Sequence, residues 1–322
     1  MHGLALATRG TRAGSEDDMP LLEAARYDLT AFAGLARSAL GFQERHLDVL
    51  LRRGFTQVAA EFAQMARRFD PAVSGDDIFQ ASRNVWTMNG LQLLLGLPVQ
   101  LTPAIFAYSM LYPYTDNYLD DPAIPVVTKM AFSERFRQRL TGEHVAPANE
   151  HERRIYDLVA MVEDQFERSR YPQVYGSLLA IHRAQEESLR LLHGNTSPCQ
   201  VDVLGIGLEK GGTSVLADGY LVAGTLTPAQ ADFMFGWGAF VQFGDDLQDV
   251  EEDGRDGLMT IFSQTARHGP LEGLTNRTLH FGLKVLEGLV CFDAPGAGPV
   301  KELIGRSAVQ LITGAAGRAP RH

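Results

Sequence analysis

The sequence predicts an all-α fold built as a single helical bundle, and three observations support this prediction. Apolar residues recur at helical intervals from Leu21 onward. Alternating strand patterns rich in valine or threonine are nearly absent. The periodicity breaks at glycine and proline clusters, such as Gly96 to Pro98 and Gly224 to Pro228, where helices are expected to end.

The breaks delimit a series of predicted helices along the chain. The helix that starts near 227 has the clearest beginning, because Thr227 is a favoured N-cap residue and Pro228 suits the first helical position. The predicted helices cover residues 21–38, 43–68, 76–96, 102–121, 128–141, 149–168, 173–194, 199–218, 227–254, 269–291 and 298–314.

The chain is expected to form one domain. Its middle has no linker of disordered composition and no repeat of fixed period. Residues 20–322 are therefore predicted to form a single all-α domain. Residues 1–19 are rich in Gly, Thr, Ser and Asp and lack the long apolar core of a secretion signal, so we expect a disordered tail there.

Composition restricts the class of protein. With 322 residues, of which 45% are hydrophobic and 21% charged, the chain can bury a large core. A net charge of −10 without a basic tract argues against nucleic acid as a partner. The two cysteines, Cys199 and Cys291, indicate a reducing, cytoplasmic compartment rather than a disulfide framework. No uncharged apolar run is long enough to suggest a membrane span.

Two short acidic segments, residues 116–121 (DNYLDD) and 245–253 (DDLQDVEED), interrupt stretches that otherwise have the pattern of buried helix. Aspartates four residues apart share one helix face, so each segment directs several carboxylates the same way. Like charges beside apolar neighbours favour protonation unless a cation compensates them. All-oxygen sites suit Mg²⁺, which typically binds one or two carboxylates together with substrate phosphates. The aspartates in question are Asp116 and Asp120 in the first segment and Asp245, Asp249 and Asp253 in the second.

Both acidic segments lie near the ends of long predicted helices, 102–121 and 227–254. A bundle can bring two such ends to one mouth, above apolar and aromatic walls. Aromatic residues at helical spacing more often form ordinary core, so only their position beneath the acidic segments makes them candidates for a binding cavity.

The acidic segments resemble those of the class I isoprenoid synthases, which include terpene synthases, trans-prenyl diphosphate synthases and, more distantly, squalene and phytoene synthases. Residues 116–121 look like the first aspartate-rich motif, with Asn117 where a second Asp is usual. Residues 244–250 (GDDLQDV) resemble the second motif of prenyl diphosphate synthases. The positions of Asp245, Asp249 and Asp253 also fit the terpene-synthase metal triad, so this segment does not separate the subfamilies.

The resemblance implies a bundle around a central apolar cavity and a magnesium-dependent reaction on a prenyl diphosphate. Three Mg²⁺ would neutralise the departing diphosphate, and aromatic rings would stabilise the resulting carbocation. Asp116, Asp120, Asp245 and Asp249 are the expected catalytic residues. The implied metal ligands are Asp116, Asp120, Asp121, Asp245, Asp249 and Asp253, with Asn117 and Asp246 as second choices. The candidate aromatic residues are Tyr112, Tyr114, Phe240 and Phe243.

Cationic side chains are also expected to contact the diphosphate, because metal alone rarely satisfies all of its oxygens. Lys210, followed by Gly211 and Gly212, resembles the Lys-Thr region of prenyl synthases, where small residues permit a helix break. Arg83 and Asn84 form a polar pair in an apolar helix, and Arg255 follows the second motif. Each of these residues has an alternative interpretation as a surface side chain that pairs with an exposed acid.

Departures from the family pattern bear on the reaction. The arginine pair that usually follows the first motif is replaced by Pro122 to Pro125, and Leu258 stands near the place of a lysine after the second motif. Those cations help to bind the second diphosphate, so their absence favours cyclisation or elimination over elongation with isopentenyl diphosphate. The C-terminal Arg-Tyr pair of many bacterial cyclases is also missing, and elongation and head-to-head coupling therefore stay open. A homodimer is expected from the family alone.

Other classes of protein fit less well. A di-iron bundle needs Glu three residues before His on two helices, and no histidine has it. Residues 245–256 lack the ligand spacing of an EF-hand, and residues 205–211 lack the spacing and context of a dinucleotide loop. A helical interaction protein without catalytic activity, in which the acidic segments are solvated faces, is the alternative from another class.

Overall fold

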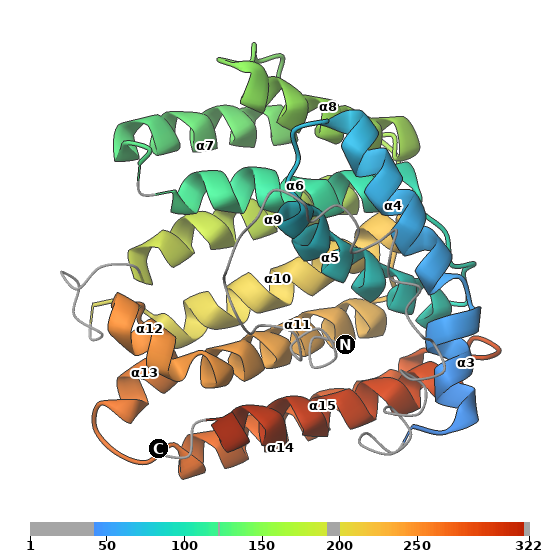
Figure 1. Cartoon of the computed structure of the whole chain (residues 1–322), viewed down its shortest axis with the longest axis vertical. Helices are drawn as coiled ribbons and strands as arrows, with labels where there is room; N and C mark the ends of the chain where they lie inside the picture. The colour runs from blue at the N-terminus through green and yellow to red at the C-terminus, as the bar shows by residue number, and fades with distance from the viewer. Residues whose placement is uncertain (1–41, 122, 192–199, 319–322) are drawn as a thin grey trace.

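The computed structural model describes residues 42–121, 123–191 and 200–318, and in these residues it is helical throughout, without a β-strand (Figure 1). The predicted all-α class is therefore confirmed. The predicted tail over 1–19 and the predicted helix over 21–38 lie outside the described residues. None of the helices in the described part of the chain combines the length and the apolar composition that crossing a bilayer requires.

Thirteen α-helices and two short 3-10 helices make up the described fold. The α-helices are α3 (Glu44–Arg52), α4 (Phe55–Phe69), α5 (Gly75–Leu94), α6 (Pro103–Asp120), α7 (Val126–Thr141), α8 (Glu150–Gln165), α9 (Pro172–Ser188), α10 (Val203–Ala223), α11 (Pro228–Gln248), α12 (Val250–Asp256), α13 (Ile261–Ala266), α14 (Glu272–Glu287) and α15 (Gly298–Arg318). The 3-10 helices are η2 (Leu189–Leu191) and η3 (Gly288–Cys291).

Helices α10 and α11 form the centre of the bundle, with α5, α6 and α9 packed on α10 and with α14 and α15 packed on α11 (Figure 1). The two central helices approach each other at glycines. A Cβ atom at position 238 would lie 2.1 Å from the carbonyl oxygen of Gly211. A Cβ atom at position 211 would lie 2.5 Å from the carbonyl oxygen of Gly238. Only glycine fits at these two positions, because the backbones themselves are in contact.

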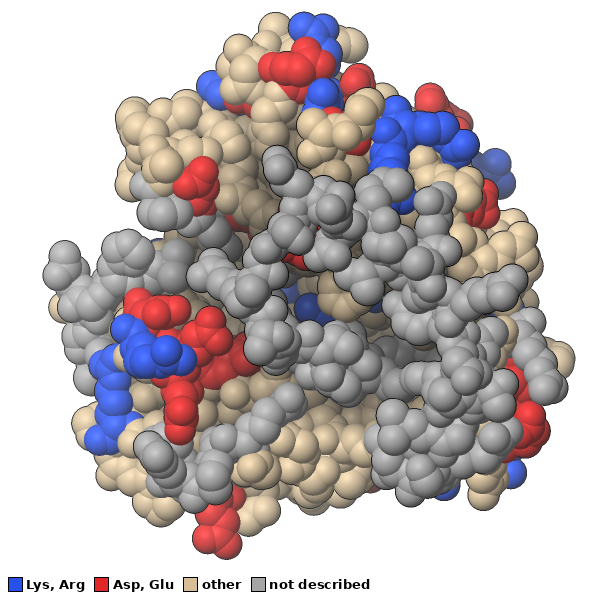
Figure 2. All heavy atoms as spheres, in the orientation of Figure 1, with Lys and Arg blue, Asp and Glu red and all other residues tan. Residues whose placement is uncertain are grey.

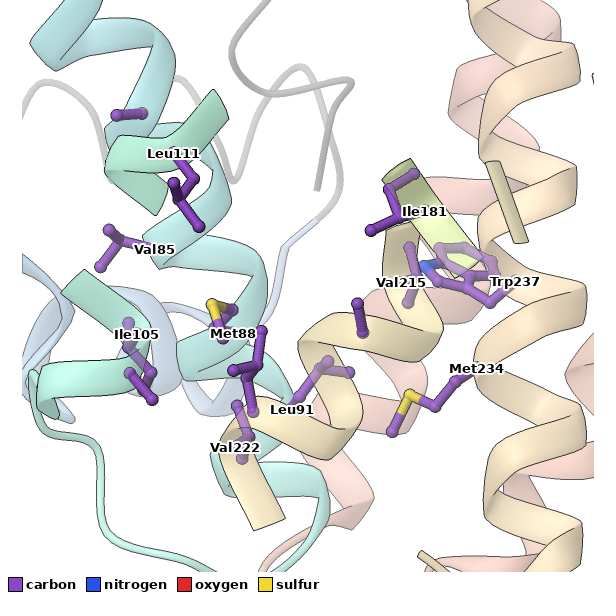
Figure 3. Close-up of a cluster of buried hydrophobic side chains, with 14 of the residues drawn as sticks. Val85, Met88, Leu91, Ile105, Leu111, Ile181, Val215, Val222, Met234 and Trp237 are labelled. Carbon is purple, nitrogen blue, oxygen red and sulfur yellow. The ribbon is translucent and has the colours of Figure 1, made fainter. Parts of the chain in front are cut away.

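The buried apolar side chains form one large cluster that extends from Phe42 to Ala315. Figure 3 shows the part of this cluster where α5, α6, α9, α10 and α11 meet, with side chains from each helix directed between the ribbons. Hydrophobic burial at this junction is the main stabilising contribution to the arrangement of these helices.

Helices α6 and α11 run in the same direction across the molecule, so that their C-terminal ends lie at the same end of the bundle (Figure 1). The start of α11 follows the prediction, because Thr227 caps it. Its hydroxyl accepts from the N–H of Gln230 at 3.3 Å, and its own N–H donates to the Gln230 side chain at 3.0 Å. The fold thus brings the ends of the two helices that carry the acidic segments to one end of the molecule.

Three boundaries differ from the prediction for identifiable reasons. The predicted helix 43–68 is interrupted at Gly54, whose positive φ of 93° ends α3 and allows α4 to start in a new direction. Helix α13 begins at the Thr260 cap, a short element that the periodicity did not reveal. The expected helix break at Gly211 and Gly212 is wrong: α10 is continuous there, because these glycines allow close packing rather than a turn.

Candidate active site

The first acidic segment forms the last turn and a half of α6. The N-cap of this helix is Thr102, whose hydroxyl accepts from the N–H of Ile105 at 3.2 Å. Asp116 is partly buried, and its Oδ1 accepts a hydrogen bond from the side chain of Gln185 on α9. The predicted site residue Asp116 is therefore held in place by α9, and this contact was not predicted from the sequence.

The remaining polar residues of this segment have separate contacts. The Asn117 amide donates to Oδ1 of Asp77 on α5 at 2.9 Å, which ties the end of α6 to the start of α5. Asp121 is the C-cap residue of α6, and its Oδ1 accepts from the N–H of Ala123 at 2.8 Å. The side chains of Asp120 and Tyr112 lie outside the described residues.

The second acidic segment spans the junction of α11 and α12. The two helices meet at Asp249, whose φ of −97° and ψ of 12° mark a slight irregularity. The hydrogen-bond ladder nevertheless continues through the junction, since the N–H of Asp249 donates to the Asp245 carbonyl at 2.9 Å and that of Asp253 to the Asp249 carbonyl at 2.8 Å. Helical spacing is therefore kept, and Asp245, Asp249 and Asp253 stay on one face. Figure 2 shows acidic side chains gathered over α12 at the left of the view.

Burial and mutual repulsion raise the pKa values of this second group of carboxyls. The pKa of Asp245 rises to about 7, chiefly because burial disfavours its charged form, with further contributions from the charges of Asp246 and Asp249. Burial also raises the pKa of Asp246 to about 6 and that of Asp253 to about 7. A cation placed among these carboxyls would favour their ionised form, and binding such a cation would release protons.

Two of the predicted cationic residues lie beside these carboxyls. The guanidinium of Arg83 on α5 lowers the pKa of Asp245 in part, and the ammonium of Lys210 on α10 acts on Asp246 in the same direction. Nε of Arg83 is buried and has no hydrogen-bond partner among the described residues. Arg83 thus lies near enough to Asp245, and Lys210 near enough to Asp246, for each charge to act on its own carboxyl.

Arg255 has a different position from these two cations. It is exposed on α12, and its Nε donates to the carbonyl oxygen of Glu251 at 3.2 Å. Asn84 lies one residue after Arg83 but contacts other groups, since its amide donates to Oγ of Ser109 on α6 at 3.3 Å. It also lies beside the carboxyl of Asp218 on α10.

The carboxyls of this site fit a hard divalent cation that takes only one or two of its ligands from the protein. Within the described residues, no group of three or more His, Cys, Asp or Glu side chains is arranged to hold a metal ion by itself. Carboxylates one helical turn apart instead suit Mg²⁺, which takes one or two protein carboxylates and completes its shell with water and phosphate oxygens. The second acidic segment could hold such ions through Asp245, Asp249 and Asp253, and Asp116 could supply a carboxylate from α6.

Three of the candidate aromatic residues pack away from the face that carries the carboxyls, which differs from the expectation. Tyr114 donates its hydroxyl to Asp70 and stacks on His151, with ring centroids 5.5 Å apart, so it lies between α4 and α8. Phe240 fills the space above Gly282 of α14, and Phe243 packs on Phe281 of the same helix. All three join helices to one another, which is the ordinary role of aromatic residues at helical spacing.

A small cavity lies next to the first acidic segment, between α6, α7 and α9. Its volume of about 40 Å³ accommodates a few water molecules and is too small for a prenyl chain. Gln185, which holds Asp116, contributes to its wall. The other lining residues are Tyr108, Leu111, Thr115, Phe136, Leu140, Leu178, Ile181 and His182.

Sequence reasoning missed two polar residues at this end of the bundle and one in its interior. Gln185 and Asp77 were missed because their partners, Asp116 and Asn117, are distant in the sequence. Asp218 had a usable signal, since a lone carboxyl in the apolar stretch 215–223 is unusual without a partner or a function.

Comparison of the chain with models of known protein families, with curated proteins and with solved structures found no match. The function of the chain is therefore inferred from the chemistry of the residues at this end of the bundle.

Proposed function

We propose that the protein is a class I terpene synthase, which ionises a prenyl diphosphate with the help of Mg²⁺ and converts the resulting carbocation by cyclisation or elimination. The observation that supports this proposal most strongly is the column of crowded, partly buried carboxyls on α11 and α12 beside Arg83 and Lys210. Carboxyls whose pKa values approach neutrality gain most from a divalent cation, and the two cations beside them suit an anionic ligand.

Each charged group has a distinct task in this proposal. Bound Mg²⁺ would supply the positive charge that stabilises the departing diphosphate. Lys210 and Arg83 would donate hydrogen bonds to diphosphate oxygens, and the unpartnered Nε of Arg83 is one donor available for that purpose. Gln185 would hold the Asp116 carboxylate in a fixed orientation from α9. Departure of the leaving group would then require little rearrangement of the protein.

The helices behind this end of the bundle offer an apolar environment for the hydrocarbon chain. Most buried side chains of α5, α6, α10 and α11 are apolar, and Figure 3 shows part of the cluster that they form. A carbocation formed among them would be shielded from water, which would otherwise quench it. Binding of such a chain requires these helices to separate, because the cavity beside the first acidic segment, at about 40 Å³, is too small for it.

The test is release of inorganic diphosphate from geranyl, farnesyl and geranylgeranyl diphosphates, with and without Mg²⁺ and with and without isopentenyl diphosphate, followed by product analysis. We expect magnesium-dependent release and a hydrocarbon product that does not depend on isopentenyl diphosphate. Asp245→Asn should abolish release while the fold stays intact. The matched control is Asp256→Asn, which removes an exposed carboxyl from the adjoining short helix α12.

The alternatives give different results in the same experiment. A longer diphosphate that forms only with isopentenyl diphosphate would indicate chain elongation. No release from any substrate by a folded protein would favour the helical interaction protein. Equal release by the Asp245→Asn variant and the wild type would contradict the role of the carboxyl column.

A further inference from the structure

Asn117 departs from the motif that the first acidic segment resembles, and the structure gives this residue a specific contact. The resemblance places a second Asp at this position. In the structure the Asn117 side chain is exposed near the end of α6, and its amide donates to Oδ1 of Asp77 on α5 at 2.9 Å. A carboxylate at position 117 has no proton to donate, so an aspartate there could not make this hydrogen bond.

The carboxylate of Asp77 is oriented by the start of its own helix. Ser74, the N-cap residue of α5, donates its hydroxyl to Oδ2 of Asp77 at 2.7 Å. The same hydroxyl oxygen accepts from the N–H of Asp77 at 3.0 Å, which is the usual contact of an N-cap side chain. The Ser74 hydroxyl thus holds Oδ2 within the first turn of α5, and Oδ1 is the oxygen that receives the Asn117 amide.

A second polar contact joins the same two helices two turns away. Asn84 follows Asp77 by seven residues, which places both on one face of α5. The amide of Asn84 donates to Oγ of Ser109 on α6 at 3.3 Å, and Ser109 precedes Asn117 by eight residues. The first half of α5 is therefore held along the later part of α6 at two points, Asp77 and Asn84.

The part of α5 between these two contacts carries Arg83. Since consecutive residues lie about 100° apart around a helix, Arg83 leaves α5 on a different side from Asn84. Burial raises the pKa of Asp245 on α11, and the guanidinium of Arg83 lies near enough to offset part of that rise. Nε of Arg83 is buried without a hydrogen-bond partner among the described residues. Helix α5 thus contacts the first acidic segment through Asp77 and approaches the second through Arg83.

We propose that Asn117 and Asp77 are positioning residues, and that the hydrogen bond between them fixes the place of Arg83 at the diphosphate. This inference rests on the proposed function, in which Arg83 donates to that ligand. Asn117 is then a donor to α5 and not a metal ligand. The two roles give opposite expectations for Asn117→Asp. An added carboxylate strengthens magnesium binding if position 117 faces the metal, but it repels Asp77 and displaces Arg83 if the position faces α5.

Calorimetric titration with inorganic diphosphate in the presence of Mg²⁺ distinguishes these two roles. We expect Asn117→Asp to weaken diphosphate binding about tenfold, the order of magnitude of one hydrogen bond to a charged group. The reversed pair combines Asn117→Asp with Asp77→Asn. It should restore the affinity to within about twofold of the wild type, because the amide at position 77 can donate to the carboxylate at position 117.

The matched control combines Asn117→Asp with Asp76→Asn, because Asp76 is exposed and precedes Asp77 in the first turn of α5. This control has the same net charge as the reversed pair but cannot rebuild the hydrogen bond, so its diphosphate binding should stay weak. Arg83→Gln gives a second check. In that background Asn117→Asp should cause little further loss of affinity, since its effect passes through Arg83. Thermal unfolding shows whether each variant is folded.

Three results would overturn this proposal. The first is diphosphate binding by Asn117→Asp that is as tight as that of the wild type or tighter. The second is a reversed pair that binds no better than its control. The third is an undiminished effect of Asn117→Asp in the Arg83→Gln background. Absence of magnesium-dependent diphosphate binding by the wild type would instead show that the proposed function itself is wrong.

Discussion

Carboxyl groups have opposite surroundings in two regions of this molecule. Between α7, α8 and the start of α9, acids have arginine partners: Arg135 binds the buried Glu152 with contacts of 2.9 and 2.5 Å, and Arg139 and Arg168 both bind the half-buried Glu163. Burial alone would raise the pKa values of Glu152 and Glu163, but the arginine hydrogen bonds and charges bring both below the ordinary range. On α11 and α12 the balance is reversed, and the pKa values rise.

The comparison separates acids that stabilise the fold from acids that are available to a ligand. A paired acid is satisfied by the protein itself and joins two helices. The acids of the second acidic segment are buried and crowded with one another, and in their ionised form they cost folding free energy that protonation or an added cation can recover. Retaining such a group is consistent with a functional site, where perturbed pKa values tend to cluster.

The largest difference between the second acidic segment and the paired acids should be in the rate of diphosphate release after mutation. We expect Asp245→Asn to lower magnesium-dependent diphosphate release by roughly 100-fold or more, because it removes charge stabilisation of the leaving group. Glu163→Gln, in the paired region, should change the rate of a folded sample little. Steady-state diphosphate release at saturating Mg²⁺ measures both. Equal losses in the two variants would remove the distinction between the regions.

The next largest effect should be on the stability of the paired region. Arg135→Met leaves the carboxyl of Glu152, which is 1% exposed, without its partner, and should destabilise the protein by about 3 kcal/mol. Arg137→Met removes an exposed partner of Glu134 from the same helix and should leave the midpoint of unfolding unchanged. Urea unfolding of both variants checks this prediction. A small effect of Arg135→Met would show that the pairing is unimportant for the fold.

In the second acidic segment, removal of a carboxyl should increase the stability of the protein, in contrast to removal of an arginine from the paired region. In the absence of Mg²⁺ at about pH 8, Asp245→Asn removes a buried charge and should stabilise the protein by on the order of 2 kcal/mol, after allowance for partial exposure. The exposed control Asp256→Asn should stay within about 0.5 kcal/mol of the wild type. Chemical unfolding in the presence of a chelator gives both values. Destabilisation by Asp245→Asn would contradict the repulsion inferred for the column.

The smallest effect concerns pH. The pKa values of Asp245, Asp246 and Asp253 are raised in the folded state to about 7, 6 and 7, above the value of about 3.9 for an unfolded Asp. The folded state therefore binds more protons between these limits, and the contribution of these groups to stability is fully present below about pH 4 and is lost as the pH rises towards 7. Added Mg²⁺ should oppose the loss, so it should raise the Tm more at about pH 8 than at about pH 5. Thermal unfolding as a function of pH and Mg²⁺ checks this sign.

Much of the fold follows from local sequence signals. Helix α6 was predicted within one residue at each end, because Thr102, Pro103 and the polar residues after Asp120 are strong boundary signals. Gly54 was less informative, since a single glycine within a helical pattern does not show whether its φ is positive. The continuity of α10 through Gly211 could not be predicted, because the reason for those glycines is the partner helix α11.

The candidate site likewise has features that local sequence signals predict and features that depend on tertiary packing. Helical spacing predicted the shared face of Asp245, Asp249 and Asp253, since it depends only on local geometry. Which side of a helix faces which neighbour depends on tertiary packing, and for this reason the positions of Tyr114, Phe240 and Phe243 were not predictable. The contact of Gln185 with Asp116 and the position of Asp218 beside Asn84 also arise only when distant helices meet.

The most direct test of the central claim, that the carboxyl column with Arg83 and Lys210 holds magnesium and diphosphate together, is calorimetric titration of the wild type with inorganic diphosphate in the presence and absence of Mg²⁺. We predict tight binding only when both are present, accompanied by proton release, and loss of that binding in Asp245→Asn but not in Asp256→Asn. Binding that is independent of Mg²⁺, or equally tight in Asp245→Asn, would contradict the account.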